Sequence, residues 1–165
     1  MNSVIINAQE IPLPSWSSAA VEFALNVLDE IKRDNWELSI VLCDDKTITA
    51  MNRQYRNKNE PTDVLSFNLG ETIQDGNRTV YLPGDIVISL DSLKENSKYF
   101  QIPEDEELCR LIIHGILHLD GMDHSSSIGE GAKAENSGET MLELQEDILK
   151  KLKIKHIINL HGVKI

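Results

Sequence analysis

The sequence predicts a single-domain α/β fold of the α+β type, because strand-like and helix-like segments alternate along a chain of one-domain length. The 165 residues fit one domain and are enough to bury a core. Hydrophobic residues make up 41% of the chain and charged residues 26%, which is typical of a globular protein. We find no internal repeat or dividing linker, so we expect one domain over 1–153 and leave the tail, 154–165, unassigned.

Local patterns place the individual elements. We expect strands where apolar residues alternate or run together, and helices where they recur every three or four positions. Ser15 and either Asp44 or Asp45 are good N-caps, and Pro61 disfavours helix in the residue before it. These rules predict strands at 3–7, 36–44, 63–69 and 79–90, and helices at 16–33, 45–56, 91–100, 104–119 and 139–153.

The two later strands are expected to pair as a hairpin. Residues 63–69 and 79–90 are separated by GETIQDGNR, a link that contains glycine and asparagine. Pro83 and Gly84 fall inside the second strand, where proline lacks an N–H for the ladder. We therefore expect a break or a bulge at this point.

Pro103 and the acidic run EDEE open the helix expected over about 104–119. Proline suits the first helical position, and acidic residues suit the positive end of a helix. A metal site is an alternative interpretation of these acids, but cap chemistry explains them more simply. After Glu107 the helix has almost no polar face, so we expect protein to surround it on most sides.

Three of the chain's five histidines fall within HGILHLDGMDH. Their spacing matches the metzincin protease motif HExxHxxGxxH, except that Gly115 replaces the general-base glutamate. His114 and His118 share one helix face, and Gly121 can end the helix so that His124 folds back. We predict that these three histidines bind a metal ion and leave a fourth position for water, as in a catalytic zinc site.

These residues also allow other interpretations. A lone histidine on an apolar helix is usually a hydrogen-bonded core residue, but two of them would need costly polar partners that one metal supplies. Asp120 and Asp123 either orient the imidazoles or solvate the turn. Glycine inside a helix costs about 1 kcal/mol relative to alanine, so Gly115 predicts that something approaches the helix backbone there.

Charge and cysteine content narrow the function classes. The net charge of −11 argues against broad attraction to nucleic acid or anionic membranes, although RQYRNK, Arg53 to Lys58, forms a local basic cluster. No apolar run approaches the roughly 20 residues of a membrane span, and no secretory signal is visible. Cys43 and Cys109 lie among apolar residues and are expected to be reduced core residues. A cytoplasmic protein without membrane partners is the simplest interpretation.

Three segments together resemble the bacterial YbeY family of metal-dependent endoribonucleases. The family carries segments close to HGxLHLxGYDH, LNxxYRxKDxPTDVLSFP and GDIxIS. The corresponding segments here are HGILHLDGMDH, MNRQYRNKNEPTDVLSFNLG and GDIVIS, at compatible spacing over about 36–124. Met122 and Asn68 depart from the aromatic residue and the proline that the family usually has.

The resemblance implies a small mixed sheet packed with helices, a zincin-like buried helix, and one zinc ion bound by His114, His118 and His124. It implies a zinc-dependent, single-strand-specific endoribonuclease in 16S rRNA 3′-end maturation and ribosome quality control. The implied partners are rRNA, the small ribosomal subunit, and ribosomal or assembly proteins. Arg56 corresponds to an arginine implicated in the family's activity. With Lys58 it would bind phosphate, although cations are also favoured at any helix C-terminus.

Two other functions stay open from the sequence. A non-catalytic ribosome-assembly factor with a structural zinc would use the acidic surface to bind basic ribosomal proteins. An atypical zincin would hydrolyse peptides or another substrate, although Gly115 in place of the glutamate disfavours it.

Overall fold

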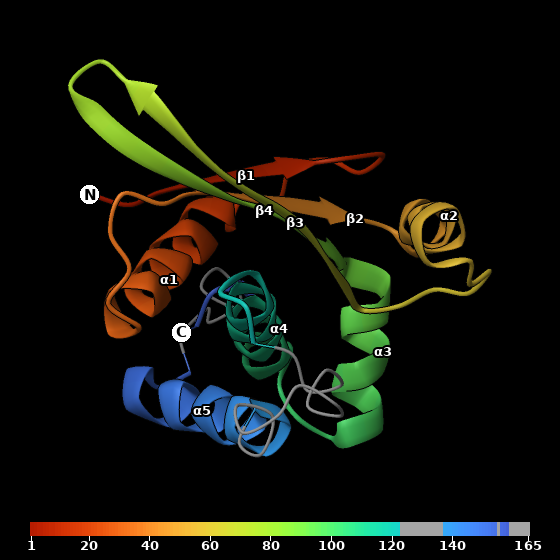
Figure 1. Ribbon diagram of the computed structural model, residues 1–165. Helices are drawn as coiled ribbons and strands as arrows, with labels where there is room; N and C mark the ends of the chain where they lie inside the picture. The colour runs from red at the N-terminus through yellow and green to blue at the C-terminus, as the bar shows by residue number, and fades with distance from the viewer. Residues whose placement is uncertain (123–136, 155, 159–165) are drawn as a thin grey trace.

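A computed structural model describes residues 1–122, 137–154 and 156–158 (Figure 1). Within these residues, a four-stranded sheet lies over a layer of helices that covers one of its faces. The elements in chain order are β1 (Ser3–Ala8), α1 (Ser17–Glu30), β2 (Glu37–Cys43), α2 (Asp45–Arg56), β3 (Val64–Asp75), β4 (Arg78–Ser89), α3 (Leu90–Phe100), α4 (Glu104–Leu119) and α5 (Ser137–Leu152).

The sheet is mixed and has the strand order β1-β2-β4-β3. β1 pairs with β2 in parallel, β2 with β4 in parallel, and β3 with β4 antiparallel. The prediction of an α/β domain with a small mixed sheet is therefore confirmed. None of the helices among the described residues is long and apolar enough to cross a membrane.

Alternation along the strands divides the apolar residues between the two faces of the sheet. In β2, Leu38, Ile40 and Leu42 belong to the main core, where they meet α1, α4 and α5. Val41 and Cys43 point to the other face, where α2 packs in a smaller apolar cluster. Cys43 and Cys109 are both buried thiols, as the sequence predicted.

Helix α4 runs through the middle of the helical layer (Figure 1). It is enclosed by protein along most of its length, as its apolar sequence predicted. Its buried residues after the first turn are Leu108, Cys109, Leu111, Ile112, Ile113, Gly115, Ile116, Leu117 and Leu119.

The β3–β4 hairpin is longer than predicted and projects past the rest of the sheet (Figure 1). Most of the expected link, 70–78, is strand, because Gly76 adopts a positive φ of 63° and permits a tight turn before Arg78. The register shifts between Asn68 and Glu71, opposite Pro83. The predicted irregularity next to this proline is therefore confirmed.

The predicted N-terminal caps of the helices are confirmed only in part. Asp44 caps α2, since its Oδ1 accepts a hydrogen bond of 2.9 Å from the Thr47 N–H. Ser15 does not cap α1: Trp16 holds that position and no side chain bonds the helix end. Pro103 is the N-cap of α4 rather than its first helical residue, because its ψ of 147° is extended.

Candidate metal centre

His114 and His118 lie together on one face of α4, as predicted. Their ring centroids are 4.7 Å apart and their planes are inclined by 71°. Both side chains are half-buried on a helix that is otherwise mostly buried. At this separation two imidazoles can direct nitrogens at one ion, for which Zn–N distances are about 2.0–2.1 Å.

Gly115 sets the distance between α4 and the sheet. A Cβ atom at this position would lie 2.8 Å from Cγ2 and 2.9 Å from Cδ1 of Ile86 in β4. The prediction that something approaches the helix backbone at Gly115 is confirmed by this contact. A side chain at 115 would point into β4, so a glutamate there would meet Ile86 first.

A hydrogen-bonded glutamine on α5 contacts the first histidine. His114 Nδ1 lies 2.7 Å from Oε1 of Gln145, whose side chain is buried. The Gln145 amide nitrogen donates to Glu146 at 3.2 Å. Two guanidinium nitrogens of Arg110 each donate to the Glu146 carboxylate at 3.0 Å, and a third donates to Glu106 at 3.0 Å.

This network keeps Glu146 ionised. The hydrogen bond from Arg110 lowers the pKa of the Glu146 carboxyl below its ordinary value. The charged pair therefore holds the distal end of the network in one arrangement.

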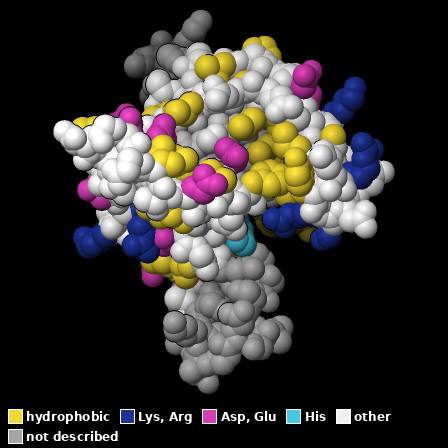
Figure 2. Space-filling model, turned by 45° about the horizontal axis from the view of Figure 1, so that its top comes forward, with side chains coloured by type: hydrophobic (Ala, Val, Ile, Leu, Met, Phe, Trp, Pro, Cys, Tyr) yellow, Lys and Arg dark blue, Asp and Glu magenta, His cyan; other side chains and the backbone are white. Residues whose placement is uncertain are grey.

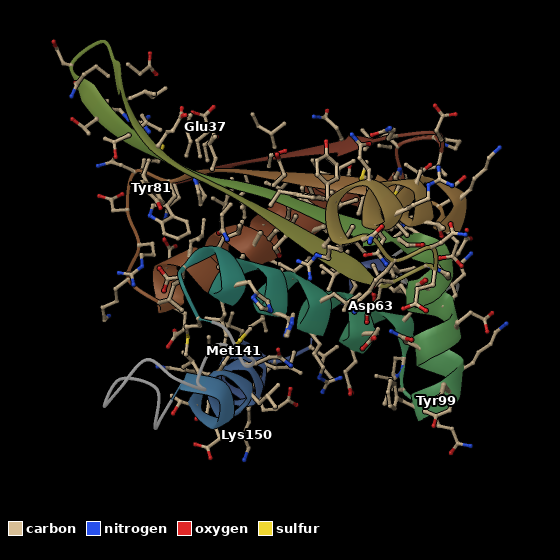
Figure 3. The ribbon with its side chains drawn as sticks, turned by 45° about the vertical axis from the view of Figure 1, so that its right-hand side comes forward. Glu37, Asp63, Tyr81, Tyr99, Met141 and Lys150 are labelled. Carbon is tan, nitrogen blue, oxygen red and sulfur yellow. The ribbon has the colours of Figure 1, made fainter. Side chains whose placement is uncertain are left out.

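Gln145 is a site residue that was not predicted from the sequence. It interrupts the apolar stripe of α5, whose Met141, Ile148 and Leu149 are buried in the main core (Figure 3 labels Met141, which faces α4). A polar residue inside such a stripe is a signal that could have identified it.

The third predicted ligand, His124, lies outside the described residues, as does Asp123. Within the ranges that the structure describes, no group of three His, Cys, Asp or Glu side chains is placed to hold a metal. To hold a metal, the pair on α4 would need a further ligand, and His124 stays the predicted one. Asp120 pairs with Arg33 at 2.6 and 3.0 Å, which ties the end of α4 to the segment after α1.

The acidic start of α4 anchors two other parts of the chain. Asp105 is buried, and its Oδ1 accepts hydrogen bonds from the backbone N–H groups of Ile157 at 2.9 Å and Ile158 at 2.6 Å. Glu107 is buried and accepts a bond of 2.9 Å from Asn96. These acids thus do more than complement the helix dipole, which was their predicted role.

Arg56 and Lys58 lie at and just after the end of α2, where Asn57 ends the helix with a φ of 59°. Both side chains are exposed, and within the part of the chain that the structure describes neither forms an ion pair or contacts the histidines. The loop that follows is held to α2 by a bond of 2.9 Å from the Asn52 amide to the Glu60 carbonyl. Both cations are therefore accessible to an anionic ligand.

The helical spacing of Ile48, Met51 and Tyr55 predicts an apolar stripe on α2, and Tyr55 differs from this prediction. Its side chain is 63% exposed and rests edge-on against Phe67, with ring centroids 5.1 Å apart. Both rings line an open groove of about 1010 Å³ between α2 and the sheet. Figure 2 shows apolar side chains gathered on this face, with Lys and Arg side chains along their edge.

The two departures from the family pattern have structural roles. Asn68 pairs with Gly84 in the β3–β4 ladder. Met122 is partly buried and packs against the main core. Neither replaces a proposed ligand.

Comparison with known proteins places the chain in one family. It matches the family described as Endoribonuclease YbeY over residues 4–153. The endoribonuclease YbeY of Treponema denticola is 43% identical over 154 residues, which cover 92% of this chain and 94% of that protein. Its namesake from Persephonella marina is 39% identical over 154 residues, with coverage of 93% and 94%.

A solved structure shares the fold. The solution structure of TM1509 from Thermotoga maritima aligns with a TM-score of 0.55 and 24% identity, over 92% of this chain and 91% of that one. This match concerns architecture alone, whereas the sequence matches cover nearly the whole chain at higher identity. The chain belongs to the endoribonuclease YbeY family.

Proposed function

We propose that this protein is a zinc-dependent, single-strand-specific endoribonuclease of the cytoplasm that acts in 16S rRNA 3′-end maturation and ribosome quality control. The observation that carries the proposal is the His114–His118 pair, with ring centroids 4.7 Å apart on the buried helix α4. Relatives that are 39–43% identical over most of the chain are named endoribonucleases.

The donor set suits zinc. Two imidazoles lie at i and i+4 of one helix, and His114 has a carbonyl oxygen at 2.7 Å from its Nδ1, as metal-bound histidines commonly have. His124 is the proposed third ligand. When bound by three histidines, zinc supplies a Lewis acid and lowers the pKa of a coordinated water towards about 7.

Arg56 is proposed to bind the phosphate that is cleaved. A guanidinium can donate two parallel hydrogen bonds to phosphoryl oxygens and offset the negative charge that grows on them during cleavage. Its exposure supports this role, because no described acidic partner occupies it. Lys58 lies two residues further along the loop and is proposed as a second phosphate contact.

Exposed Tyr55 supports single-stranded RNA as the substrate. An aromatic ring beside cationic side chains lets a base stack while its phosphates are neutralised, and a base inside a duplex cannot stack in this way. The chain's net charge of −11 disfavours RNA binding elsewhere on the surface, so we expect RNA to bind at this local cationic element. We propose rRNA and the small ribosomal subunit, with ribosomal or assembly proteins, as the partners.

The test compares purified variants on a single-stranded RNA that carries the 3′ end of precursor 16S rRNA. We expect His118→Ala to abolish zinc-dependent cleavage. We expect Arg56→Ala to reduce it by about 100-fold, as for removal of one donor to a developing oxyanion, with zinc binding unchanged. Lys98→Ala, which removes an exposed cation from the last turn of α3, is the matched control and should cleave like the wild type.

Equal cleavage by the wild type and His118→Ala would contradict the proposal and indicate a contaminating nuclease. If zinc removal unfolds the protein and Arg56→Ala still supports rRNA maturation in cells, a non-catalytic assembly factor with a structural zinc is favoured instead.

A further inference from the structure

A buried glutamine 31 residues after His114 contacts that histidine from another helix. We infer that Gln145 is a positioning residue of the metal centre, and that it fixes which nitrogen of His114 presents a lone pair. The inference rests on the proposed role of His114 as a metal ligand, and it adds a residue on α5 to the histidine pair of α4.

The orientation of the Gln145 amide follows from its two neighbours. One end lies 3.2 Å from a carboxylate oxygen of Glu146, and the other lies 2.7 Å from Nδ1 of His114. An ionised carboxylate only accepts hydrogen bonds, so the end beside Glu146 must be the NH₂ group. The carbonyl oxygen of the amide therefore faces His114.

The tautomer of His114 follows in turn. A carbonyl oxygen also only accepts, so Nδ1 of His114 must carry the proton and donate it. In the neutral ring the lone pair is then on Nε2, which is the nitrogen that would bind a metal. The same bond fixes the rotation of the ring, and outer partners of this kind typically change metal affinity by 10–100-fold.

The far end of the chain of hydrogen bonds is held by charge. Arg110 contacts Glu146 through two nitrogens at 3.0 Å each and also contacts Glu106 at 3.0 Å. Arg110 is four residues before His114 on α4, so the network starts and ends on the same helix and passes through α5. Rotation of the Gln145 amide would place its oxygen against the Glu146 carboxylate, which this arrangement disfavours.

A purely structural role for Gln145 is the alternative. Gln145 is 6% exposed, and its neighbours on the buried stripe of α5 are apolar. A methionine of similar length would fill the same space without burying a polar group. If packing alone mattered, Gln145→Met would therefore keep the metal affinity of the wild type.

The experiment measures zinc affinity by competition with a chelator in the full-length protein. We expect Gln145→Met to bind zinc 10–100-fold more weakly than the wild type. Glu143→Met, the matched control on the exposed face of α5, should leave affinity unchanged. If Gln145→Met does not fold, Glu146→Ala decides: several-fold weaker binding supports the inference, and unchanged binding overturns it.

A second readout needs no metal. Imidazole ¹⁵N shifts of the metal-stripped protein should show His114 protonated on Nδ1 in the wild type, and a mixture or the other tautomer in Gln145→Met. Unchanged tautomer and unchanged affinity would overturn the inference. Loss of the tautomer preference, with zinc binding that His118→Ala does not weaken, would show that Gln145 sets the tautomer of His114 but would reject the metal site itself.

Discussion

A Cβ atom at Gly115 would lie 2.8 Å from Cγ2 of Ile86, so α4 lies closer to β4 than a residue with a Cβ atom at position 115 would permit. The relationship explains a glycine in the interior of a buried helix, where it otherwise costs about 1 kcal/mol. It also explains the difference from the metzincin motif. The close helix–strand contact occupies the direction in which the protease glutamate would leave the helix.

Gly115→Ala is therefore expected to destabilise the protein. Overpacking of this kind typically costs about 1–3 kcal/mol, and the better helix propensity of alanine returns at most about 1 kcal/mol. We expect a net loss of about 1–2 kcal/mol in the free energy of unfolding, measured by urea denaturation.

Ile86→Val and Ile86→Ala provide the control for this contact. If the clash with Ile86 is the cause, Gly115→Ala should cost less in the Ile86→Ala background, with a coupling of about 1 kcal/mol between the two sites. Additive effects, or a Gly115→Ala variant as stable as the wild type, would show that the spacing is not set by this pair.

The features that the sequence predicted are those that depend on near neighbours. Asp44 caps the helix that begins one residue later, and the irregularity beside Pro83 follows from its missing N–H. The features that it missed depend on distant parts of the chain. Gln145 contacts a histidine 31 residues away, and Tyr55 is exposed because only part of α2 packs on the sheet.

The outer part of the β3–β4 hairpin was also not predicted as strand. It carries exposed residues on both faces, so no alternation of apolar and polar residues identifies it as strand. Backbone pairing from Glu71 to Asp75 with β4 holds it instead. The candidate site was predicted to the extent of the α4 pair, whereas the position of Arg56 relative to it depends on how α2 packs against the sheet.

Glu107 is expected to make stability depend on pH. Burial raises the pKa of its carboxyl; Asp63 and Glu106 add to this, while the Asn96 hydrogen bond and Arg110 oppose it. Because the folded state then holds the proton more tightly, the related stability is present at acid pH and is lost as pH rises from the unfolded pKa through the folded one. The free energy of unfolding of Glu107→Gln, relative to that of the wild type, should therefore be higher at pH 8 than at pH 4.

Urea denaturation at both pH values measures this difference. Glu143→Gln makes the same chemical change on the exposed face of α5 and reports the effect of removing one negative charge from the chain. If the free energy of unfolding of Glu107→Gln differs from that of the wild type by the same amount at pH 4 and pH 8, the buried carboxyl is excluded as the source of the pH dependence.

Asp105 is expected to hold the segment after α5 against the start of α4. Its carboxylate accepts from the N–H groups of Ile157 and Ile158, and a hydrogen bond to a charged group contributes about 1.5–3 kcal/mol. Asp105→Ala should lower the free energy of unfolding by about 2–4 kcal/mol, and Asp105→Asn by less, because the amide keeps one acceptor. In a chain shortened to end at His156, Asp105→Ala should cost clearly less; an undiminished cost would place its contribution elsewhere.

Zinc is expected to stabilise the folded protein through the histidines of α4. A ligand that binds only the folded state stabilises it by RT ln(1 + [L]/Kd), which is about 4 kcal/mol at a thousandfold excess over Kd. We expect this increment in the wild type when chelated and zinc-loaded samples are compared by thermal unfolding. His118→Ala should lose most of it, because two remaining histidines hold zinc less tightly than three.

His156→Ala is the matched control, because His156 is an exposed histidine that lies beside Asp105 rather than on the histidine face of α4. It should keep the full zinc increment. The comparison separates specific binding from general affinity of histidine for the metal, since both variants lose one imidazole. An increment that is equal in His118→Ala and the wild type would mean that zinc binds elsewhere on the chain, and the close approach of the two imidazoles on α4 would then need another explanation.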